Sequence, residues 1–210
     1  MNLPNQLSIL RILLTPVFVF LLFLDGFTFK LLSFAVFTVA SLTDIYDGHV
    51  ARKYGNVSVT GQFLDPLADK ILISSAFICF NLLGYVPVWM VLIIVIRDFL
   101  LTGLRSYAIA QNRPIRTMFL AKAKTFSQVV MAYFIFLFHL AVNSRLTGSY
   151  RVIIQWVEDN RLIYSLMFMV TILTALSGVM YLVVNRDHLI RIGRSLYRIF
   201  VPSDAGGFHS

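Results

Sequence analysis

Long runs without a charged residue limit the possible folds of this chain more than any other feature. They cover residues 12–24, 31–43, 71–96, 126–144 and 162–185. A helix needs about 20 residues to cross the hydrocarbon core of a bilayer. Because 58% of the residues are hydrophobic and only 13% are charged, a soluble domain could not cover its surface with polar groups. We therefore predict an all-α integral membrane protein.

The run at 71–96 is too long for one helix, and Asn81, Gly84 and Pro87 interrupt it. We predict a tight turn at 83–87 between two helices. The first two runs reach the length of a span when polar neighbours are included. The sequence then predicts six transmembrane helices, at roughly 6–24, 29–53, 62–83, 86–110, 118–142 and 161–185. They form one domain over 1–200, and we expect a flexible tail over 201–210.

The positive charges predict the orientation in the membrane. Most of the 18 Lys and Arg residues fall on the side that would hold the N-terminus, so we expect both termini to be cytoplasmic. The net charge of +8 then reflects topology and attraction to anionic membrane lipid. We expect no nucleic-acid partner, because the chain has no solvated basic domain. Residues 158–161 should form a solvated external loop.

Half of the ten acidic residues lie in or at the edge of predicted spans, where a carboxylate is costly. An Asp at the centre of a span costs about 2.5–3.5 kcal/mol, so such residues are functional by default. Asp44 and Asp47 are three residues apart, and Asp65 and Asp69 are four apart. Each pair shares a helix face. If the two faces meet, four carboxylates line one cavity.

Four adjacent carboxylates would repel one another, and two divalent cations would balance their charge. Oxygen ligands without Cys or a suitably placed His favour Mg²⁺ or Mn²⁺ over Zn²⁺. A pair of such ions suits displacement at phosphorus. Ion pairing with Arg52, Lys53 and Lys70 is the alternative explanation.

Residues 44–52, DIYDGHVAR, and 61–69, GQFLDPLAD, fill every fixed position of the pattern D-x-x-D-G-x-x-A-R…G-x-x-x-D-x-x-x-D. From Asn2 to about Asn185 the chain resembles the CDP-alcohol phosphotransferase family. The resemblance implies six transmembrane helices around a cytosol-facing polar cavity, two divalent ions and a homodimer. It also implies transfer of a phosphoalcohol from a CDP-linked donor, with release of CMP.

Three further stretches resemble the branch of this family that forms phosphatidylglycerophosphate: 2–11, 63–70 and 97–105 with 122–125. That branch uses CDP-diacylglycerol and sn-glycerol 3-phosphate at the inner (cytoplasmic) membrane. Asp98 replaces the Glu typical of it. Asp occurs there in the cardiolipin-synthase branch, whose acceptor is phosphatidylglycerol, so that alternative remains open. A cation-coupled transporter is a distant alternative. Its acidic residues would be scattered over several helices, whereas four acidic residues of this chain lie close together in the sequence, from Asp44 to Asp69.

The resemblance assigns a role to each candidate residue. The metal ligands are Asp44, Asp47, Asp65 and Asp69, and Asp69 is also the general base, with a role as a ligand alone as the alternative. The residues expected to bind CDP-diacylglycerol are Asn5, Ser8, Asp47, Gly48, Ala51, Arg52, Ser58 and Gly61. For some of these a structural role is the alternative: helix packing for the small residues, positive-inside anchoring for Arg52 and helix capping for Ser58.

We expect the phosphate of glycerol 3-phosphate to meet cations near the metal cavity. The candidates are Arg97, Arg105, Lys122 and Lys124. Arg97 and Asp98 are adjacent and point about 100° apart on a helix, so each is predicted to pair with another helix instead of with the other.

Overall fold

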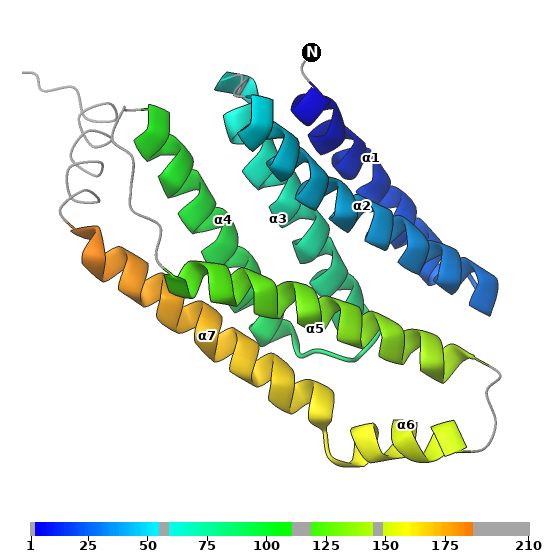
Figure 1. Cartoon of the computed structure of the whole chain (residues 1–210). Coiled ribbons are helices and arrows are strands. Elements are labelled where there is room, and N and C mark those ends of the chain that lie inside the picture. Colours follow the sequence, from blue (N-terminus) through cyan, green and yellow to red (C-terminus); the bar gives the residue numbers. More distant parts are fainter. Residues whose placement is uncertain (1–2, 55–58, 111–118, 145–148, 187–210) are drawn as a thin grey trace, which may run out of the picture.

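The computed structural model describes residues 3–54, 59–110, 119–144 and 149–186, and this part of the chain is helical with short turns (Figure 1). The side chains of 3–5, 44–54, 59–65, 109–110, 119–122 and 149–150 are not described. The helices are α1 (Leu3–Phe23), α2 (Phe27–Tyr54), α3 (Val59–Leu82), α4 (Val88–Ala110), α5 (Phe119–Asn143), α6 (Ser149–Asp159) and α7 (Leu162–Val184). The predicted tail at 201–210 lies outside the described residues.

Six of these helices coincide with the six predicted segments to within one turn at each end. By length and composition, three stretches of the described chain could cross a membrane: Gln6–Phe23, Ala123–Asn143 and Leu162–Val184. The described part of α2, Phe27–Thr43, is a shorter apolar stretch. The protein is therefore membrane-embedded. The described side chains of α2 and α3 cover shorter stretches, and α4 carries three charged residues, Arg97, Asp98 and Arg105.

The helix α6 was not predicted, and the expected solvated loop at 158–161 is only partly correct, because all four residues are exposed but only the last two lie outside a helix. Glu158 and Asp159 form the last turn of α6, and only Asn160 and Arg161 connect it to α7. The apolar residues of this segment recur at helical spacing, but the segment is too short and too polar to stand out as a span.

The predicted turn at 83–87 is confirmed, and it ends α3 with a Schellman motif. The amide of Tyr85 donates to the carbonyl of Phe80 at 2.9 Å, and that of Gly84 donates to Asn81 at 2.9 Å. Gly84 has a φ of +82°, which a residue with a side chain rarely adopts. Asn81 Nδ2 also donates to the carbonyl of Val86 at 2.7 Å. Together these bonds fix the reversal between α3 and α4.

Aromatic rings hold four helices together away from the candidate site. Phe37 of α2 packs against Phe18 of α1 at 5.6 Å between ring centroids and against Phe136 of α5 at 5.5 Å. Phe136 also contacts Phe80 of α3 at 5.7 Å. All four rings are fully buried. Packing of this kind fixes the helices relative to one another, so polar groups on them can be held at defined distances.

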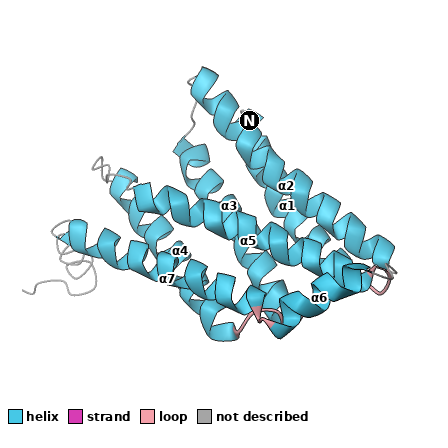
Figure 2. Cartoon of the chain, turned by 60° about the horizontal axis from the view of Figure 1, so that its bottom comes forward, coloured by secondary structure: helices cyan, strands magenta, loops and turns pink. Residues whose placement is uncertain are grey.

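The helix ends gather at two opposite ends of the molecule. The start of α1, the end of α2, the start of α3 and the end of α4 lie together at the top of Figure 1. The turn at 83–87 and α6 lie at the other end (Figure 2). The signature residues are in the last part of α2 and the first part of α3, so they belong to the first of these ends.

Candidate functional site

The two halves of the signature lie on two consecutive helices that pack together. Asp44, Asp47, Gly48, Ala51 and Arg52 belong to α2, whereas Gly61, Asp65 and Asp69 belong to α3. The backbone is helical through both segments, so each predicted acidic pair does share a helix face.

Most signature side chains lie outside the part that the structure describes. This applies to every signature residue up to Asp65 and to Asn5, while Ser58 falls in the undescribed segment 55–58. Among the described side chains, no group of three His, Cys, Asp or Glu residues could hold a metal ion. The assignment of Asp44, Asp47 and Asp65 as ligands therefore remains a prediction. Ser8 is described and is fully buried on α1.

Asp69, the last acid of the signature, belongs to a network of ion pairs that joins α3, α4 and α5. Lys70 Nζ lies 3.4 Å from Asp69 Oδ2 and 3.8 Å from Asp98 Oδ2 of α4. Ion pairing with Lys70 was the alternative to metal binding by the signature carboxylates, and the structure contains such an ion pair at Asp69. Lys70 also links that carboxylate to a second, more deeply buried one.

Asp98 is the centre of this cluster and is only 3% exposed. Its Oδ1 accepts hydrogen bonds from Lys124 Nζ of α5 and from Arg97 Nη1, the latter at 3.1 Å. One buried carboxylate therefore faces three cations, those of Lys70, Arg97 and Lys124. Such a surplus of positive charge is unfavourable away from water unless an anion offsets it.

The expectation that Arg97 and Asp98 avoid each other is wrong, because the long arginine side chain can bend back to its neighbour. Arg97 does reach another helix as well: its Nη2 donates to Ser177 Oγ of α7 at 2.8 Å. A Cβ added at Gly178 would lie 3.1 Å from Arg97 Cγ. The small residue at Gly178 thus leaves room for the arginine to lie against α7.

Several buried polar atoms beside this cluster have no hydrogen-bond partner among the described residues. They are Arg97 Nε, both amide atoms of Gln128 and Tyr181 Oη. Gln128 is one helical turn after Lys124 on α5 and is 1% exposed. Tyr181 of α7 is in electrostatic range of both Arg97 and Arg105. Buried polar groups are normally paired, so these atoms are suited to a polar ligand.

The structure brings together two of the four predicted acceptor-binding residues, Arg97 and Lys124. Arg105 is exposed on α4 near Tyr181, and the side chain of Lys122 is not described. Sequence reasoning did not select Lys70, Asp98 or Ser177 for the site. Asp98 carried a signal, because a carboxylate in the middle of a span is costly. Nothing in the sequence singles out Ser177.

An apolar groove lies between α1 and the middle of α3. Ile71 and Ser75 of α3 line it together with residues of α1 from Ile12 to Phe23 and with Leu24, and its volume is about 610 Å³. Ile71 is two residues after Asp69. The groove also includes Phe20 and Phe23, which are exposed. It therefore lies on an outer face of the protein.

The comparison with protein families identifies the family of this chain. The family model described as CDP-alcohol phosphatidyltransferase matches residues 1–184, which include both signature helices and the cations of the buried cluster. The chain belongs to this family. Its members carry out phosphatidyl transfer, so the acidic helices and the neighbouring cations are the candidate active site of a transferase.

Curated relatives are similar over a large part of the chain. A Bacillus subtilis protein named CDP-diacylglycerol--glycerol-3-phosphate 3-phosphatidyltransferase is 37% identical over 142 residues, which cover 61% of this chain and 73% of the relative. A Rickettsia typhi protein of the same name is 38% identical, with 61% and 72% covered. A Mycobacterium tuberculosis protein named probable phosphatidylglycerophosphate synthase is 39% identical, and the chain covers 63% of it, less than two thirds.

The residues of the signature fit the divalent metal dependence of this family. Asp44, Asp47, Asp65 and Asp69 are carboxylates on two consecutive helices, and carboxylate oxygens are the kind of ligand that hard divalent cations prefer. Asp69 is the only one of the four whose side chain is described, and it is about one quarter exposed, so it remains open to a ligand.

Proposed function

We propose that this protein transfers the phosphatidyl group of CDP-diacylglycerol to sn-glycerol 3-phosphate, giving phosphatidylglycerophosphate and CMP. The observation that carries the proposal is the buried surplus of positive charge around Asp98, joined through Lys70 to Asp69. The names of the curated relatives support the same reaction.

The acceptor explains the charge of the cluster. Glycerol 3-phosphate carries a dianionic phosphate, which can offset the positive charge that Asp69 and Asp98 together leave uncompensated among Lys70, Arg97 and Lys124. Phosphatidylglycerol has only a monoanionic phosphodiester, so it would need these cations less. The unpaired amide of Gln128 and the hydroxyl of Tyr181 can bond to the oxygen atoms of the acceptor. We assign Arg105 and Lys122 to the mouth of this site.

The donor lipid is proposed to enter sideways from the bilayer. The groove between α1 and α3 is apolar and open, and its lining residue Ile71 follows Asp69 by two positions in the sequence. It can therefore accept an acyl chain while the nucleotide end meets the signature. On that side we assign Asn5, Ser8, Asp47, Gly48, Ala51, Arg52, Ser58 and Gly61 to CDP-diacylglycerol.

In the proposed reaction, a glycerol hydroxyl attacks the phosphorus attached to diacylglycerol. The new oxygen–phosphorus bond forms as the bond to the CMP oxygen breaks, and CMP leaves. Asp69 accepts the proton of the attacking hydroxyl. Two divalent cations held by Asp44, Asp47, Asp65 and Asp69 would supply charge stabilisation at the pyrophosphate. Lys70, beside Asp69, holds that carboxylate in place.

We further propose the topology and assembly that suit this reaction. All six long helices cross the inner membrane, both termini are cytoplasmic, and the polar cavity opens to the cytosol. α2, α3 and α4 cross despite their charges because the charged residues lie near a helix end or are paired inside the bundle. The protein works as a homodimer in a membrane containing anionic lipid.

Purified protein supplied with CDP-diacylglycerol and either glycerol 3-phosphate or phosphatidylglycerol tests the proposal by release of CMP. We expect release with glycerol 3-phosphate. Release only with phosphatidylglycerol would indicate a cardiolipin synthase. Ion uptake into sealed vesicles without CMP release would indicate a transporter.

A further inference from the structure

The short helix α6 has three distinct faces. Ile154 and Val157 pack against the core of the bundle, and Val157 is only 7% exposed. Val152, Ile153 and Trp156 form a second apolar face that is 67%, 59% and 56% exposed. A third face consists of exposed polar residues at helical spacing, which are Arg151, Gln155 and Glu158. One apolar face is thus covered by protein, and the other is not.

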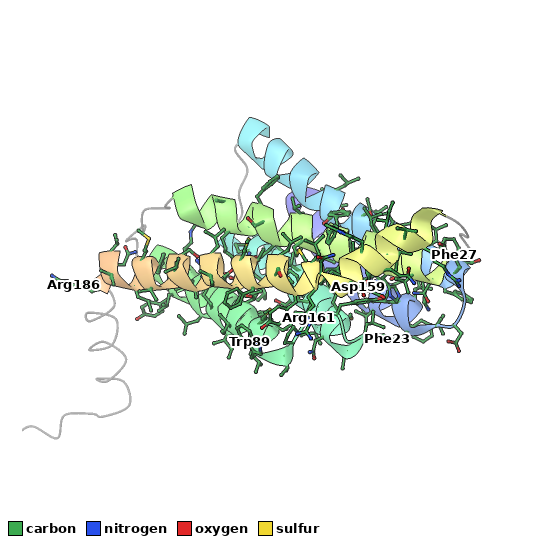
Figure 3. The ribbon with its side chains drawn as sticks, turned by 90° about the horizontal axis from the view of Figure 1, so that it is seen from below. Phe23, Phe27, Trp89, Asp159, Arg161 and Arg186 are labelled. Atoms are coloured by element: carbon green, nitrogen blue, oxygen red, sulfur yellow. The ribbon has the colours of Figure 1, made fainter. Side chains whose placement is uncertain are left out.

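The position of α6 is fixed by the helices on either side of it. It follows the candidate span Ala123–Asn143 after five residues and precedes Leu162–Val184 by two. It must therefore lie at the membrane surface where both spans end. Figure 3 shows Asp159 and Arg161 at this end of α7, with Arg186 at the opposite end.

The connection to α7 also fixes which way α6 faces. Asn160 caps α6, because its side-chain Nδ2 donates to the carbonyl of Trp156 at 2.8 Å. The amide of Arg161 donates to the carbonyl of Glu158 at 2.9 Å, and Arg161 has a left-handed φ of 48°. α6 therefore holds a defined direction, and its exposed apolar face has a defined position.

Both tryptophans of the chain occur at this end of the molecule. Trp89, 40% exposed at the start of α4, packs edge-on against Phe168 with ring centroids 6.2 Å apart. Tyr164, 43% exposed, stacks on the same ring at 6.4 Å. Tryptophan and tyrosine are enriched where a membrane protein crosses the interface between acyl chains and water. Trp156 extends this aromatic zone onto α6.

We propose that α6 is an interfacial helix that lies in the phospholipid headgroup region. Val152, Ile153 and Trp156 insert toward the acyl chains, and the face with Arg151, Gln155 and Glu158 points to water. In this arrangement the first face packs on the bundle, the exposed apolar face contacts lipid and the polar face contacts water. An amphipathic helix binds the membrane interface by burying its apolar face there. It rests on the membrane embedding alone and is independent of the proposed reaction.

Fluorescence quenching tests this placement, because Trp89→Phe leaves Trp156 as the sole tryptophan. The full-length variant is reconstituted into phosphatidylcholine vesicles that contain lipid brominated either near the headgroup or near the end of the acyl chain. Trp89→Phe/Trp156→Phe/Gln155→Trp is the matched control, because it places the fluorophore on the polar face of the same helix. We expect Trp156 to be quenched more by the shallow bromines and weakly by aqueous acrylamide, and the control to show the reverse.

Other quenching patterns overturn the proposal. Strong quenching of Trp156 by acrylamide and none by brominated lipid would place α6 in water. Protection from both quenchers would indicate that a protein surface, such as a second copy of the chain, covers it. Stronger quenching by the deep bromines would place the helix inside the hydrocarbon core. Retained unfolding temperature in each variant excludes misfolding as the cause.

Discussion

Lys124 of α5 donates a hydrogen bond to Asp98 of α4, and both side chains are almost fully buried. The two residues are 26 positions apart in the sequence. Arg97 and Lys70 share the same carboxylate, so Asp98 joins three cations from three helices. This carboxylate both stabilises the packing of the helices and positions the cations that we assign to the acceptor phosphate.

Variants of Asp98 should distinguish its contribution to stability from its contribution to acceptor binding. Asp98→Asn leaves three buried cations without their carboxylate, and removal of one partner of a buried pair costs about 3–5 kcal/mol. We expect a lower unfolding temperature in detergent. Asp98→Leu/Lys124→Met, which removes the most deeply buried pair together, should regain part of the stability but use glycerol 3-phosphate poorly. If the double variant kept a normal KM for this acceptor, the pair would have a structural role only. Asp98→Glu should retain activity.

The planar guanidinium group of Arg97 should be needed for tight binding of glycerol 3-phosphate. Arg97→Lys keeps the charge but cannot reach Asp98 and Ser177 together. Loss of a charge-assisted bond of about 1.5–3 kcal/mol should raise the KM for glycerol 3-phosphate about tenfold to a hundredfold. The KM for CDP-diacylglycerol should change little. Arg151→Lys on α6 is the control, and steady-state kinetics with each substrate varied provide the measurement. An equal rise for both substrates would refute the assignment.

The four signature carboxylates should be essential for CMP release. Asp44→Asn, Asp47→Asn, Asp65→Asn and Asp69→Asn should each nearly abolish it, because each removes a charged oxygen ligand. EDTA should do the same to the unmodified protein, and added Mg²⁺ or Mn²⁺ should restore activity. Asp25→Asn, in the exposed connection after α1, should be fully active. Full activity in any of the four would exclude that residue from the metal site.

A Mg²⁺ titration of kcat should separate a base from a ligand at Asp69. A lost ligand weakens metal binding, so excess Mg²⁺ should rescue at least part of the rate of Asp44→Asn. Loss of a general base costs about 10²–10⁴-fold whatever the metal concentration. We therefore expect Asp69→Asn to stay slow at saturating Mg²⁺. Equal rescue of both variants would make Asp69 a ligand alone.

Filling the groove between α1 and α3 should weaken binding of the donor lipid. Ile71→Trp places an indole in the groove, and we expect a higher KM for CDP-diacylglycerol with an unchanged KM for glycerol 3-phosphate. Ile78→Trp, two turns further along α3 at an exposed position outside the groove lining, is the matched control. Similar kinetics for the two variants would show that the acyl chain binds elsewhere.

The sequence by itself determined the features that depend on local pattern. Long apolar runs predicted the six long helices, because the cost of exposing apolar surface and unpaired backbone applies to each segment separately. Gly84 predicted the turn after α3, since its positive φ is a local requirement. The spacing of Asp44, Asp47, Asp65 and Asp69 predicted shared helix faces, because the helical period relates neighbours one turn apart.

Only the tertiary structure decided how residues on different helices meet. Nothing in the period of α4 or α5 requires Lys124 to reach Asp98, or Arg97 to contact both Asp98 and Ser177. These contacts depend on how the aromatic core orients the helices, and a buried charge then takes whichever partner that packing brings within reach. The tertiary structure also decided which face of α6 is buried. The turn at Asn160 and Arg161 sets the direction of this helix, and the sequence of α6 alone does not indicate which helices it will pack against.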